Sequence, residues 1–379
     1  MIYLDNSATT QPYPQVIESF QTVSTDFFAN PSSIHQPGGM AETLLAKARD
    51  QAADLLNVKS QEIVFTSGGT EGNNLAIKGI AFKHQNRGKH IITSKVEHSS
   101  VYDSCRSLEE LGFEVTYLPV NKDGVVSLID LQESIREDTI LISVMHVNNE
   151  LGSIQPIGEI GAIAKKHPKL FFHVDYVQGL CKVPLDFKKN GVDLSTMSGH
   201  KIHGLKGTGV LYVNEGVSLS PLFHGGIQEG SYRAGTENLA GAVSFVKALR
   251  ISLEKMEMNI DKLKELSAYL RQRLSTIEEI TINTPENSAP HLVNISVPGL
   301  KPEVIIHSLG EKGVIISTKS ACSSKQQEES RVLSSCGLPP EHAKAALRIS
   351  MSFETTKDEL NTFIDLLKKT IKQLKPIME

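Results

Sequence analysis

The sequence lacks the features that mark membrane and secreted proteins. None of its apolar runs approaches the roughly 20 residues that cross a bilayer. The opening residues, MIYLDNSATT, place Asp5 and Asn6 where a signal peptide needs an apolar stretch. The chain also contains no internal repeat and no low-complexity tract. We therefore expect a globular protein of the cytoplasm without a membrane partner.

Cysteine is scarce and scattered. The four cysteines are Cys105, Cys181, Cys322 and Cys336, and no two of them form a CxxC pair. Four isolated thiols in 379 residues make no disulfide framework, and the ligand spacing of a zinc or iron–sulfur site is missing. We expect no metal site, although one thiol could still be reactive.

An excess of positive charge is also missing. Lys and Arg number 39 against 43 Asp and Glu, a net charge of −4, so we expect no nucleic-acid surface. What the chain does have is length. Its 379 residues, 40% of them hydrophobic, predict one large domain and a smaller one.

Apolar runs rich in β-formers alternate with helical patterns between about residues 60 and 215. The strand-like runs are EIVFTS, KHIITS, FEVTYLPV, TILISVMHV, LFFHVD and TGVLYV. This alternation predicts an α/β fold with a mostly parallel sheet covered by helices on both faces. In such folds ligands bind at the carboxyl ends of the strands.

A long helix over residues 251–278 is predicted to lead into a second, smaller α/β domain, because apolar residues there recur at helical spacing. An amphipathic helix, TKDELNTFIDLLKKTIKQL, follows near the end. We divide the chain into a large domain at 14–250 and a small domain formed by 1–13 and 251–379.

Several polar residues follow the predicted strands, and each allows two interpretations. In FTSGGTEGNN, Gly69 and Thr70 could hold a phosphate at a helix start, or form an ordinary capped turn. In HVDYVQ, Asp175 could pair with a cationic ring nitrogen, or cap a helix; Gln178 could bind a ring oxygen. The segment is neither GxGxxG nor a P-loop, so dinucleotide and triphosphate sites are weakly supported.

Two further polar segments are equally open when taken alone. His98 in EHSS follows a strand and could be structural or catalytic. Asn149 in MHVNNELG could bind a carboxylate or a ring substituent, or form a turn.

Lys201, in SGHKIHG, changes the interpretation of these residues. A lysine near a phosphate site, an acidic partner for a ring nitrogen and several strand-end polar groups completes the parts of a pyridoxal phosphate site. A desolvated lysine among cationic neighbours has a lowered pKa, which makes its amine able to form a Schiff base. Each feature is weak by itself, but their order along one α/β domain is informative.

The whole chain resembles the cysteine desulfurases of the NifS/IscS type, members of the class V aminotransferase group of fold-type I pyridoxal phosphate enzymes. The segments that carry the resemblance occur in family order: YLDNSATT, NPSSIH, SGGTEGNN, EHSS, MHVNNE, HVDYVQ, SGHKIHG, RAGTEN, SAC and LRIS.

The resemblance implies a role for each site residue. Lys201 would bind pyridoxal phosphate covalently, His98 would stack on its ring and help to move protons, Asp175 would pair with the pyridine nitrogen, and Gln178 would bind the phenolic oxygen. The phosphate contacts would come from Gly69, Thr70, Ser198 and His200, and from Thr236 of the neighbouring subunit of a homodimer.

The reaction implied is the removal of sulfur from L-cysteine, giving L-alanine. Arg348, assisted by Asn149, would bind the substrate carboxylate. Cys322 in KSACSS would attack the substrate sulfur and carry it as a persulfide to a protein acceptor, either an Fe–S scaffold or a sulfurtransferase of tRNA thiolation. Lys319 and Lys325 nearby could favour its thiolate.

The chain departs from the family pattern at a few positions. Tyr176 replaces the usual Ala, which suggests a changed packing on the cofactor face opposite His98. Leu205 and Lys319 replace a common Pro and Gly. The chain stops at LKPIME, without the tail that some family members use with a scaffold. A selenocysteine lyase, another class V enzyme and a catalytically silent sulfur-relay scaffold stay open as alternatives.

Overall fold

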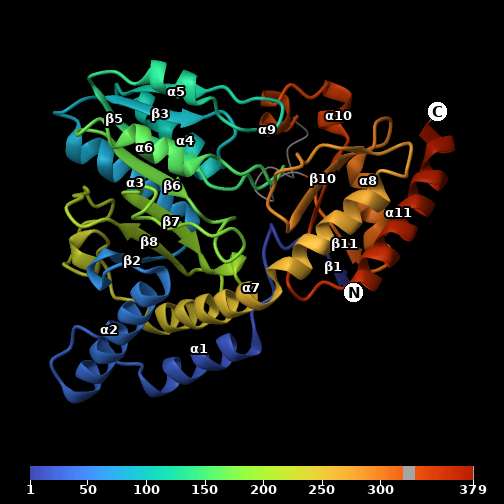
Figure 1. Ribbon diagram of the computed structural model, residues 1–379. Coiled ribbons are helices and arrows are strands. Elements are labelled where there is room, and N and C mark those ends of the chain that lie inside the picture. The colour runs from blue at the N-terminus through green and yellow to red at the C-terminus, as the bar shows by residue number, and fades with distance from the viewer. Residues whose placement is uncertain (319–328, 379) are drawn as a thin grey trace.

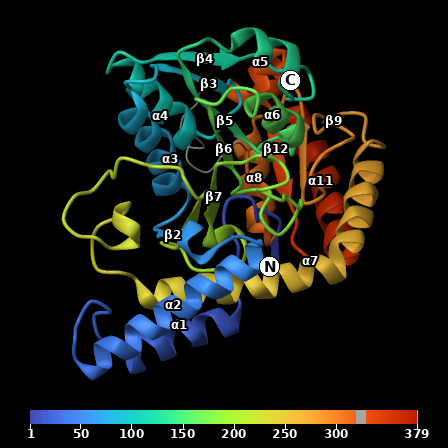
Figure 2. The same ribbon diagram turned by 60° about the vertical axis from the view of Figure 1, so that its left-hand side comes forward.

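The computed structural model describes residues 1–318 and 329–378. Figures 1 and 2 show two α/β units side by side, joined by one long helix along their lower edge. The larger unit is built on a seven-stranded sheet and the smaller one on a three-stranded sheet. The predicted α/β fold, with a large and a smaller unit, is therefore confirmed.

The central sheet is mostly parallel, as predicted. Its strands in spatial order are β2 (Ile63–Thr66), β8 (Gly209–Val213), β7 (Leu194–Ser198), β6 (Phe171–Asp175), β5 (Thr139–Met145), β3 (His90–Ser94) and β4 (Glu114–Leu118). Only β8 runs antiparallel to its neighbours. Strand β7, which leads to Lys201, is missing from the predicted series because its sequence LSTMS carries too few apolar residues to stand out.

Alternating residues of the strands belong to two separate hydrophobic cores, one on each face of the central sheet. Ile91 and Leu141 pack with α3 (Gly69–His84) and α4 (Ser99–Glu109). Ile92 and Ile142 pack on the other face, where the cover consists of α5 (Leu128–Ser134), α6 (Ile157–Ala164) and part of α7 (Leu239–Leu274). This alternation is the period-two pattern of a sheet that is buried on both faces.

The remaining elements complete the two units. In the larger unit, α1 (Pro14–Asp26) and α2 (Gln36–Leu56) pack along α7. In the smaller unit, β12 (Ala346–Ser350), β10 (Leu292–Ser296) and β9 (Thr281–Ile282) form an antiparallel sheet, and β1 (Ile2–Tyr3) pairs with β11 (Val314–Ile315). Its helices are α8 (Pro302–Glu311), α9 (Arg331–Ser335), α10 (Pro340–Lys344) and α11 (Lys357–Met378). The short 3-10 helices are η1 (Ser60–Glu62), η2 (Gly199–Lys201) and η3 (Glu229–Ser231).

Helix α7 corrects one prediction. It runs from Leu239 to Leu274, so it starts well before the predicted residue 251. Its first half, including Phe245 and Leu249, packs in the large core, and its second half, including Leu270, packs in the small core. Strand β1 pairs with β11 of the smaller unit, whereas the backbone N–H groups of Thr10 and Tyr13 donate to the carbonyls of His200 and His203 in the larger unit. The assignment of residues 1–13 to the small domain stays a prediction. The division near residue 250, which falls inside α7, stays a prediction.

Nothing in the described ranges suggests a transmembrane segment: each helix there is either too short or too polar to cross a bilayer.

Candidate functional site

A cavity of about 260 Å³ opens at the carboxyl ends of the parallel strands, where α/β folds bind ligands. It collects residues from both ends of the chain and from three central strands, β5, β6 and β7. The predicted site residues that line it are Gly69, Thr70, His98, Asn149, Asp175, Gln178, Ser198, His200, Lys201 and Arg348. The tertiary structure therefore brings ten of the twelve predicted residues together.

One end of the cavity has the features of an anion site. Helix α3 begins there at Gly69, after Gly68 turns the chain with a φ of 144° that only glycine adopts easily. A Cβ atom on Gly69 would lie 3.0 Å from Val177 Cγ2, so the backbone approaches closely. The buried Ser198 Oγ has no hydrogen-bond partner among the described residues. A helix start with such a donor beside it suits a phosphate.

Asp175 and Gln178 hold the opposite part of the cavity. Asp175 Oδ1 accepts a hydrogen bond from the backbone N–H of Val177 (3.0 Å), and Oδ2 accepts one from Asn73 Nδ2 (2.8 Å). Gln178 Nε2 donates to the carbonyl of Ser7 (2.9 Å). No helix starts directly after Asp175 in the described part of the chain, so the helix-cap alternative is wrong: the carboxylate lies at the cavity and makes a local turn contact instead.

Lys201 is held from two directions. Its Nζ donates to the carbonyl oxygens of Ser7 and of Ala8, the latter at 2.8 Å. Its own carbonyl accepts a hydrogen bond from Nζ of the buried Lys182 at 2.9 Å. The YLDNSATT segment therefore positions the amine, a role that the sequence alone did not indicate.

Burial favours the neutral form of both histidines of the site, His98 and His200. Burial, together with the nearby charge of Lys201, lowers the pKa of His200 to about 4. Burial also lowers the pKa of His98, against the smaller opposing effect of the Asp175 charge. His98 is at the same time the N-cap of α4, because its Nδ1 accepts from the backbone N–H of Ser100. The structural and the functional interpretation of His98 therefore both apply.

Arg348 is a buried cation at the side of the small domain, with 1% of its surface exposed. Its guanidinium donates to Asp5 Oδ1 (3.0 Å) and to the carbonyl of Asn149 (2.9 Å). The Nε atom has no partner among the described residues. The turn predicted as an alternative for Asn149 is made instead by Asn148, whose Oδ1 accepts from the backbone N–H groups of Glu150 and Leu151.

The expectation for Tyr176 is wrong. Tyr176 is buried away from the cavity, where its ring packs on His146 and Phe187 and its hydroxyl donates to the carbonyl of Val183. Val177 lines the cavity instead. Because side chains alternate beyond the end of β6, Asp175 and Val177 share one face and Tyr176 takes the other. Val177 is thus the residue that shapes the face near Asp175.

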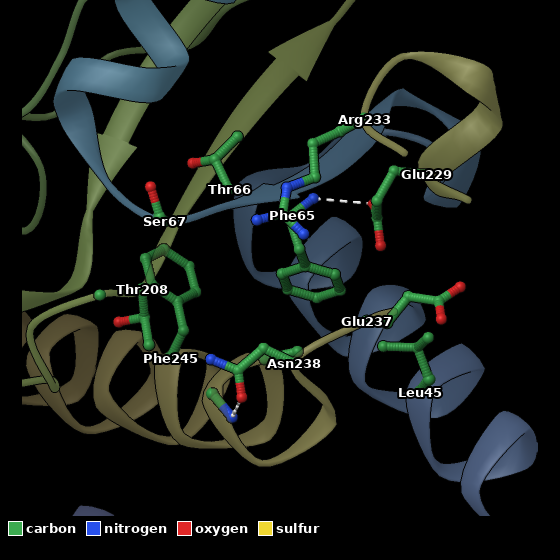
Figure 3. A pocket seen from close by; sticks show the side chains of 14 residues that line it. Leu45, Phe65, Thr66, Ser67, Thr208, Glu229, Arg233, Glu237, Asn238 and Phe245 are labelled. Carbon is green, nitrogen blue, oxygen red and sulfur yellow. Dashed lines mark hydrogen bonds between the residues drawn. The ribbon is translucent and has the colours of Figure 1, made fainter. Parts of the chain in front are cut away.

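One described residue of the predicted site, Thr236, does not line the cavity, and a second predicted residue, Cys322, cannot be placed because it lies outside the described residues. Thr236 is exposed and lies between η3 and α7. Its segment borders a second cavity of about 170 Å³, shown in Figure 3, to which Arg233, Glu237 and Asn238 contribute. Arg233 is tied there to Glu71 of α3 at 2.9 Å. Lys319 and Lys325 lie outside the described residues as well.

The other three cysteines are buried and packed. Burial raises the pKa of the Cys181 and Cys336 thiols to about 12, and it raises the pKa of Cys105 as well. None of them is disposed to form a thiolate. The reactive thiol that the sequence allowed is therefore not one of these three.

Sequence reasoning missed several residues that line the cavity. They are Ser7, Ala8, Asn73, Ser100, Met145, Val147 and Val177. For Asn73 a signal existed: it lies three residues after Thr70 on the same helix, and such residues share a face. No group of three or more His, Cys, Asp or Glu side chains in the described part of the chain is arranged to hold a metal ion.

Comparisons with known proteins agree with this geometry. Residues 2–363 match the family model of the class-V aminotransferases. The cysteine desulfurase IscS of Dictyoglomus turgidum is 45% identical, over 99% of this chain and 96% of that protein. The cysteine desulfurase IscS of Methanosarcina thermophila is 44% identical, over 99% of this chain and 93% of that protein.

Solved structures give the same result. A NifS-like protein has a TM-score of 0.93 at 34% identity and covers 98% of this chain and 100% of its own. SspA in complex with cysteine has a TM-score of 0.82 at 35% identity, covering 93% of this chain and 99% of its own. The resemblance seen in the sequence is confirmed, and the chain belongs to the class-V aminotransferase family, within its cysteine desulfurase group.

Proposed function

We propose that the protein is a pyridoxal phosphate-dependent L-cysteine desulfurase. The observation that carries this proposal is the single cavity in which Lys201, Asp175, His98 and Arg348 meet. An amine, a carboxylate, an aromatic ring and a guanidinium are the groups that a cofactor ring and an amino-acid substrate require together.

The residues of the cavity fit pyridoxal phosphate. The start of α3 and the unpartnered Ser198 Oγ suit its phosphate, Asp175 suits its ring nitrogen, and Lys201 is the amine that binds it covalently. When bound, the cofactor supplies an electron sink for bond breaking at the substrate. Neutral His200 is a hydrogen-bond donor beside the phosphate end rather than a second cation.

A charged side chain would bind the substrate, and a cysteine thiol would react with its sulfur. Arg348 would bind the carboxylate of L-cysteine through charge-assisted hydrogen bonds, with Asn149 beside it. Cys322 would attack the substrate sulfur, so that its thiol and L-cysteine become a Cys322 persulfide and L-alanine. The assignment of Cys322 rests on the sequence resemblance and on the burial of Cys105, Cys181 and Cys336.

A homodimer with shared sites is part of this proposal. Thr236 is exposed and does not line the cavity of its own chain, which is compatible with a contact to the site of a second copy. Phe28, Ile34, Phe223 and Ile227 are strongly exposed for apolar side chains. Their segments lie on the same side of the molecule in Figures 1 and 2. A partner subunit would cover such residues.

The persulfide would pass to a protein acceptor in the cytoplasm. We propose two classes of acceptor: an Fe–S scaffold and a sulfurtransferase of tRNA thiolation. Incubating the sulfur-loaded enzyme with each purified acceptor, and following labelled sulfur, distinguishes them.

The function is tested with three variants. Lys201→Ala should lose the borohydride-reducible link to the cofactor and lower alanine formation from L-cysteine about 1,000-fold or more. Lys206→Ala, which removes an exposed lysine of the same segment, is the matched control and should behave like the wild type. Cys322→Ser should keep the cofactor and its colour but lose alanine and persulfide formation.

Two results would contradict the proposal. One is a wild-type protein that binds no pyridoxal phosphate when the cofactor is added. The other is a Cys322→Ser variant that forms alanine at the wild-type rate in the presence of an acceptor. Activity on L-selenocysteine in the same assay, with none on L-cysteine, would favour the selenocysteine lyase alternative.

A further inference from the structure

A chain of hydrogen bonds connects Asp175 with His98. Asn73 Nδ2 lies 2.8 Å from Asp175 Oδ2 and 2.8 Å from Ser100 Oγ. Ser100 Oγ in turn lies 2.8 Å from His98 Nδ1. All four residues line the cavity, and Asn73 and Ser100 are buried. The residue proposed to pair with the ring nitrogen is therefore linked, through two neutral side chains, to the residue proposed to face the ring.

The direction of each bond follows from the carboxylate. An ionised Asp175 can only accept, so Asn73 must present its NH₂ group, and this settles the orientation of the amide. The same NH₂ group donates its second hydrogen to Ser100 Oγ. The single hydroxyl hydrogen of Ser100 is then available to His98, and Nδ1 of His98 is the acceptor.

A second donor, independent of the first, acts on the same nitrogen. The backbone N–H of Ser100 lies 3.2 Å from His98 Nδ1 as part of the N-cap of α4. A backbone N–H cannot accept a hydrogen bond, so a proton on Nδ1 would break this contact whatever the hydroxyl does. Burial of the imidazole also disfavours its doubly protonated form by lowering the pKa of His98. The remaining proton of a neutral ring must then be on Nε2.

We propose that Asn73 and Ser100 are positioning residues that hold His98 as the neutral tautomer with its proton on Nε2. The meaning of this for catalysis rests on the proposed function. In that state Nε2 of His98 already carries a proton and cannot accept another. A proton that has to be accepted during the reaction must then go to another group, and Lys201 is the amine that lines the same cavity.

Charged groups from several elements act on the ring and have to be considered in any titration. They are Asp175 after β6, Lys201 in η2, Arg331 in α9 and Asp103 in α4. Two of these are positive and two are negative, so their effects oppose one another. The hydrogen bonds to Nδ1 are therefore the asymmetric feature that selects the tautomer.

Nitrogen NMR of the pyridoxal phosphate-loaded protein, labelled with ¹⁵N in its histidine rings, tests the proposal directly. The His98 signals are those absent from a His98→Gln variant. We expect Nε2 to carry a proton and Nδ1 to carry none, with no change between about pH 6 and about pH 9, although a free histidine titrates near 6.5. This reading does not depend on turnover, so it can succeed or fail separately from the desulfurase assignment.

Variants on the same two helices provide the controls. In Ser100→Ala, His98 Nδ1 loses the hydroxyl donor and keeps only the longer backbone contact, and in Asn73→Ala the hydroxyl loses the amide that orients it. We therefore expect part of the neutral tautomer with its proton on Nδ1 to appear in both variants, so that the two ring nitrogen signals move toward each other. Ser100→Thr keeps the hydroxyl and should keep the wild-type spectrum. Ser104→Ala removes the hydroxyl that bonds to the Ser100 carbonyl, and Asn74→Ala removes an amide that bonds to the Thr70 carbonyl; neither contacts His98.

Three outcomes would overturn the proposal. They are a proton on Nδ1 in the wild type, a wild-type His98 that titrates near its ordinary value, and a Ser104→Ala spectrum changed in the same way as that of Ser100→Ala. Should Asn73→Ala not fold, the Ser100→Ala and Ser100→Thr pair decides the question by itself.

Discussion

The buried charge of Arg348 is compensated by the carboxylate of Asp5, so the loss of that carboxylate has a large cost. The Arg348 side chain is 1% exposed and meets Asp5, which is 15% exposed, at 3.0 Å. Arg348 comes from β12 and Asp5 from the first residues, so this pair also ties the chain start to the small sheet. In the proposed desulfurase reaction the same arginine also has to bind the substrate carboxylate.

The Asp5→Ala variant should therefore be strongly destabilised. Removing the carboxylate leaves a buried guanidinium without its countercharge, which typically costs about 3 kcal/mol of the free energy of unfolding. Urea unfolding monitored by circular dichroism measures this loss. Glu279→Ala is the control, because Glu279 pairs with Lys375 at the surface, and such pairs contribute about 0–1 kcal/mol. Equal losses in the two variants would contradict the prediction.

The raised pKa of Glu97 predicts that the free energy of unfolding depends on pH. It is buried next to His98, and burial raises its pKa to about 8, although Ser94 and the Met145 backbone N–H donate to it. An unfolded glutamate has a pKa near 4.3. Between about pH 4.3 and about pH 8, Glu97 is protonated in the folded state and ionised in the unfolded state. The free energy of unfolding therefore falls as the pH rises through this range, and above about pH 8 the stabilisation from the protonated carboxyl is lost.

Glu97→Gln should remove this dependence. The stability of the wild type relative to the variant should fall by about 3 kcal/mol between pH 5.5 and pH 8. Buried histidines with lowered pKa values, such as His200, act in the opposite direction near pH 5–6, but they are common to both proteins. Urea titrations at the two pH values measure the difference. Glu110→Gln, at an exposed site on α4, should show none.

At the scale of elements, α7 is the structural link between the two units. Its first half packs under the central sheet and its second half carries Leu263, Leu266, Leu270 and Leu274 into the small core. Exposed positions of the same helix, such as Met258 before these leucines, contribute little to either core. The helix thus sets the separation between the residues of the large sheet and Arg348 on the small one.

Leu270→Ala should destabilise the small unit by about 2–5 kcal/mol, because it removes a fully buried side chain and leaves a cavity. Met258→Ala, on the exposed face of the same helix, should change the free energy of unfolding by less than about 0.5 kcal/mol. Chemical denaturation measures both. A small effect of Leu270→Ala would mean that the second half of α7 is not held by the small core.

At the scale of the whole molecule, the proposed homodimer predicts complementation between subunits. A heterodimer of Lys201→Ala and Thr236→Ala subunits has one undamaged site if Thr236 acts on the partner's cavity. The other site then carries both changes. If Thr236 acted on its own cavity, each site would carry one change and none would be intact.

Random reassortment of the two variants should therefore restore about a quarter of the wild-type sites, since half of the dimers are mixed and each has one intact site. The measurement is alanine formation after mixing, compared with the unmixed variants. Lys206→Ala mixed with Lys201→Ala is the control that keeps an intact site in either case. No gain over the mean of the two parents would refute the contribution from the partner subunit.

Local features of this protein were predictable from the sequence. Strand–turn–helix patterns at Gly69 and Thr70, the strand that ends at Asp175 and the lysine in SGHKIHG depend on residues close together in the chain. The fold class and ten residues of the cavity followed from these patterns and from the order of the family segments. Short-range sterics and periodicity decide such features, and both can be read from a few neighbouring residues.

Other features were decided only by the tertiary structure, because they depend on packing between distant segments. The start of α7 at Leu239 follows from a face buried under the central sheet. Val177 rather than Tyr176 lines the cavity because of the way β6 packs in the sheet. The bonds from Asp175 through Asn73 and Ser100 to His98 join three elements. A hydrogen bond needs its donor and acceptor within about 3 Å and correctly aligned, and only the folded chain supplies that geometry.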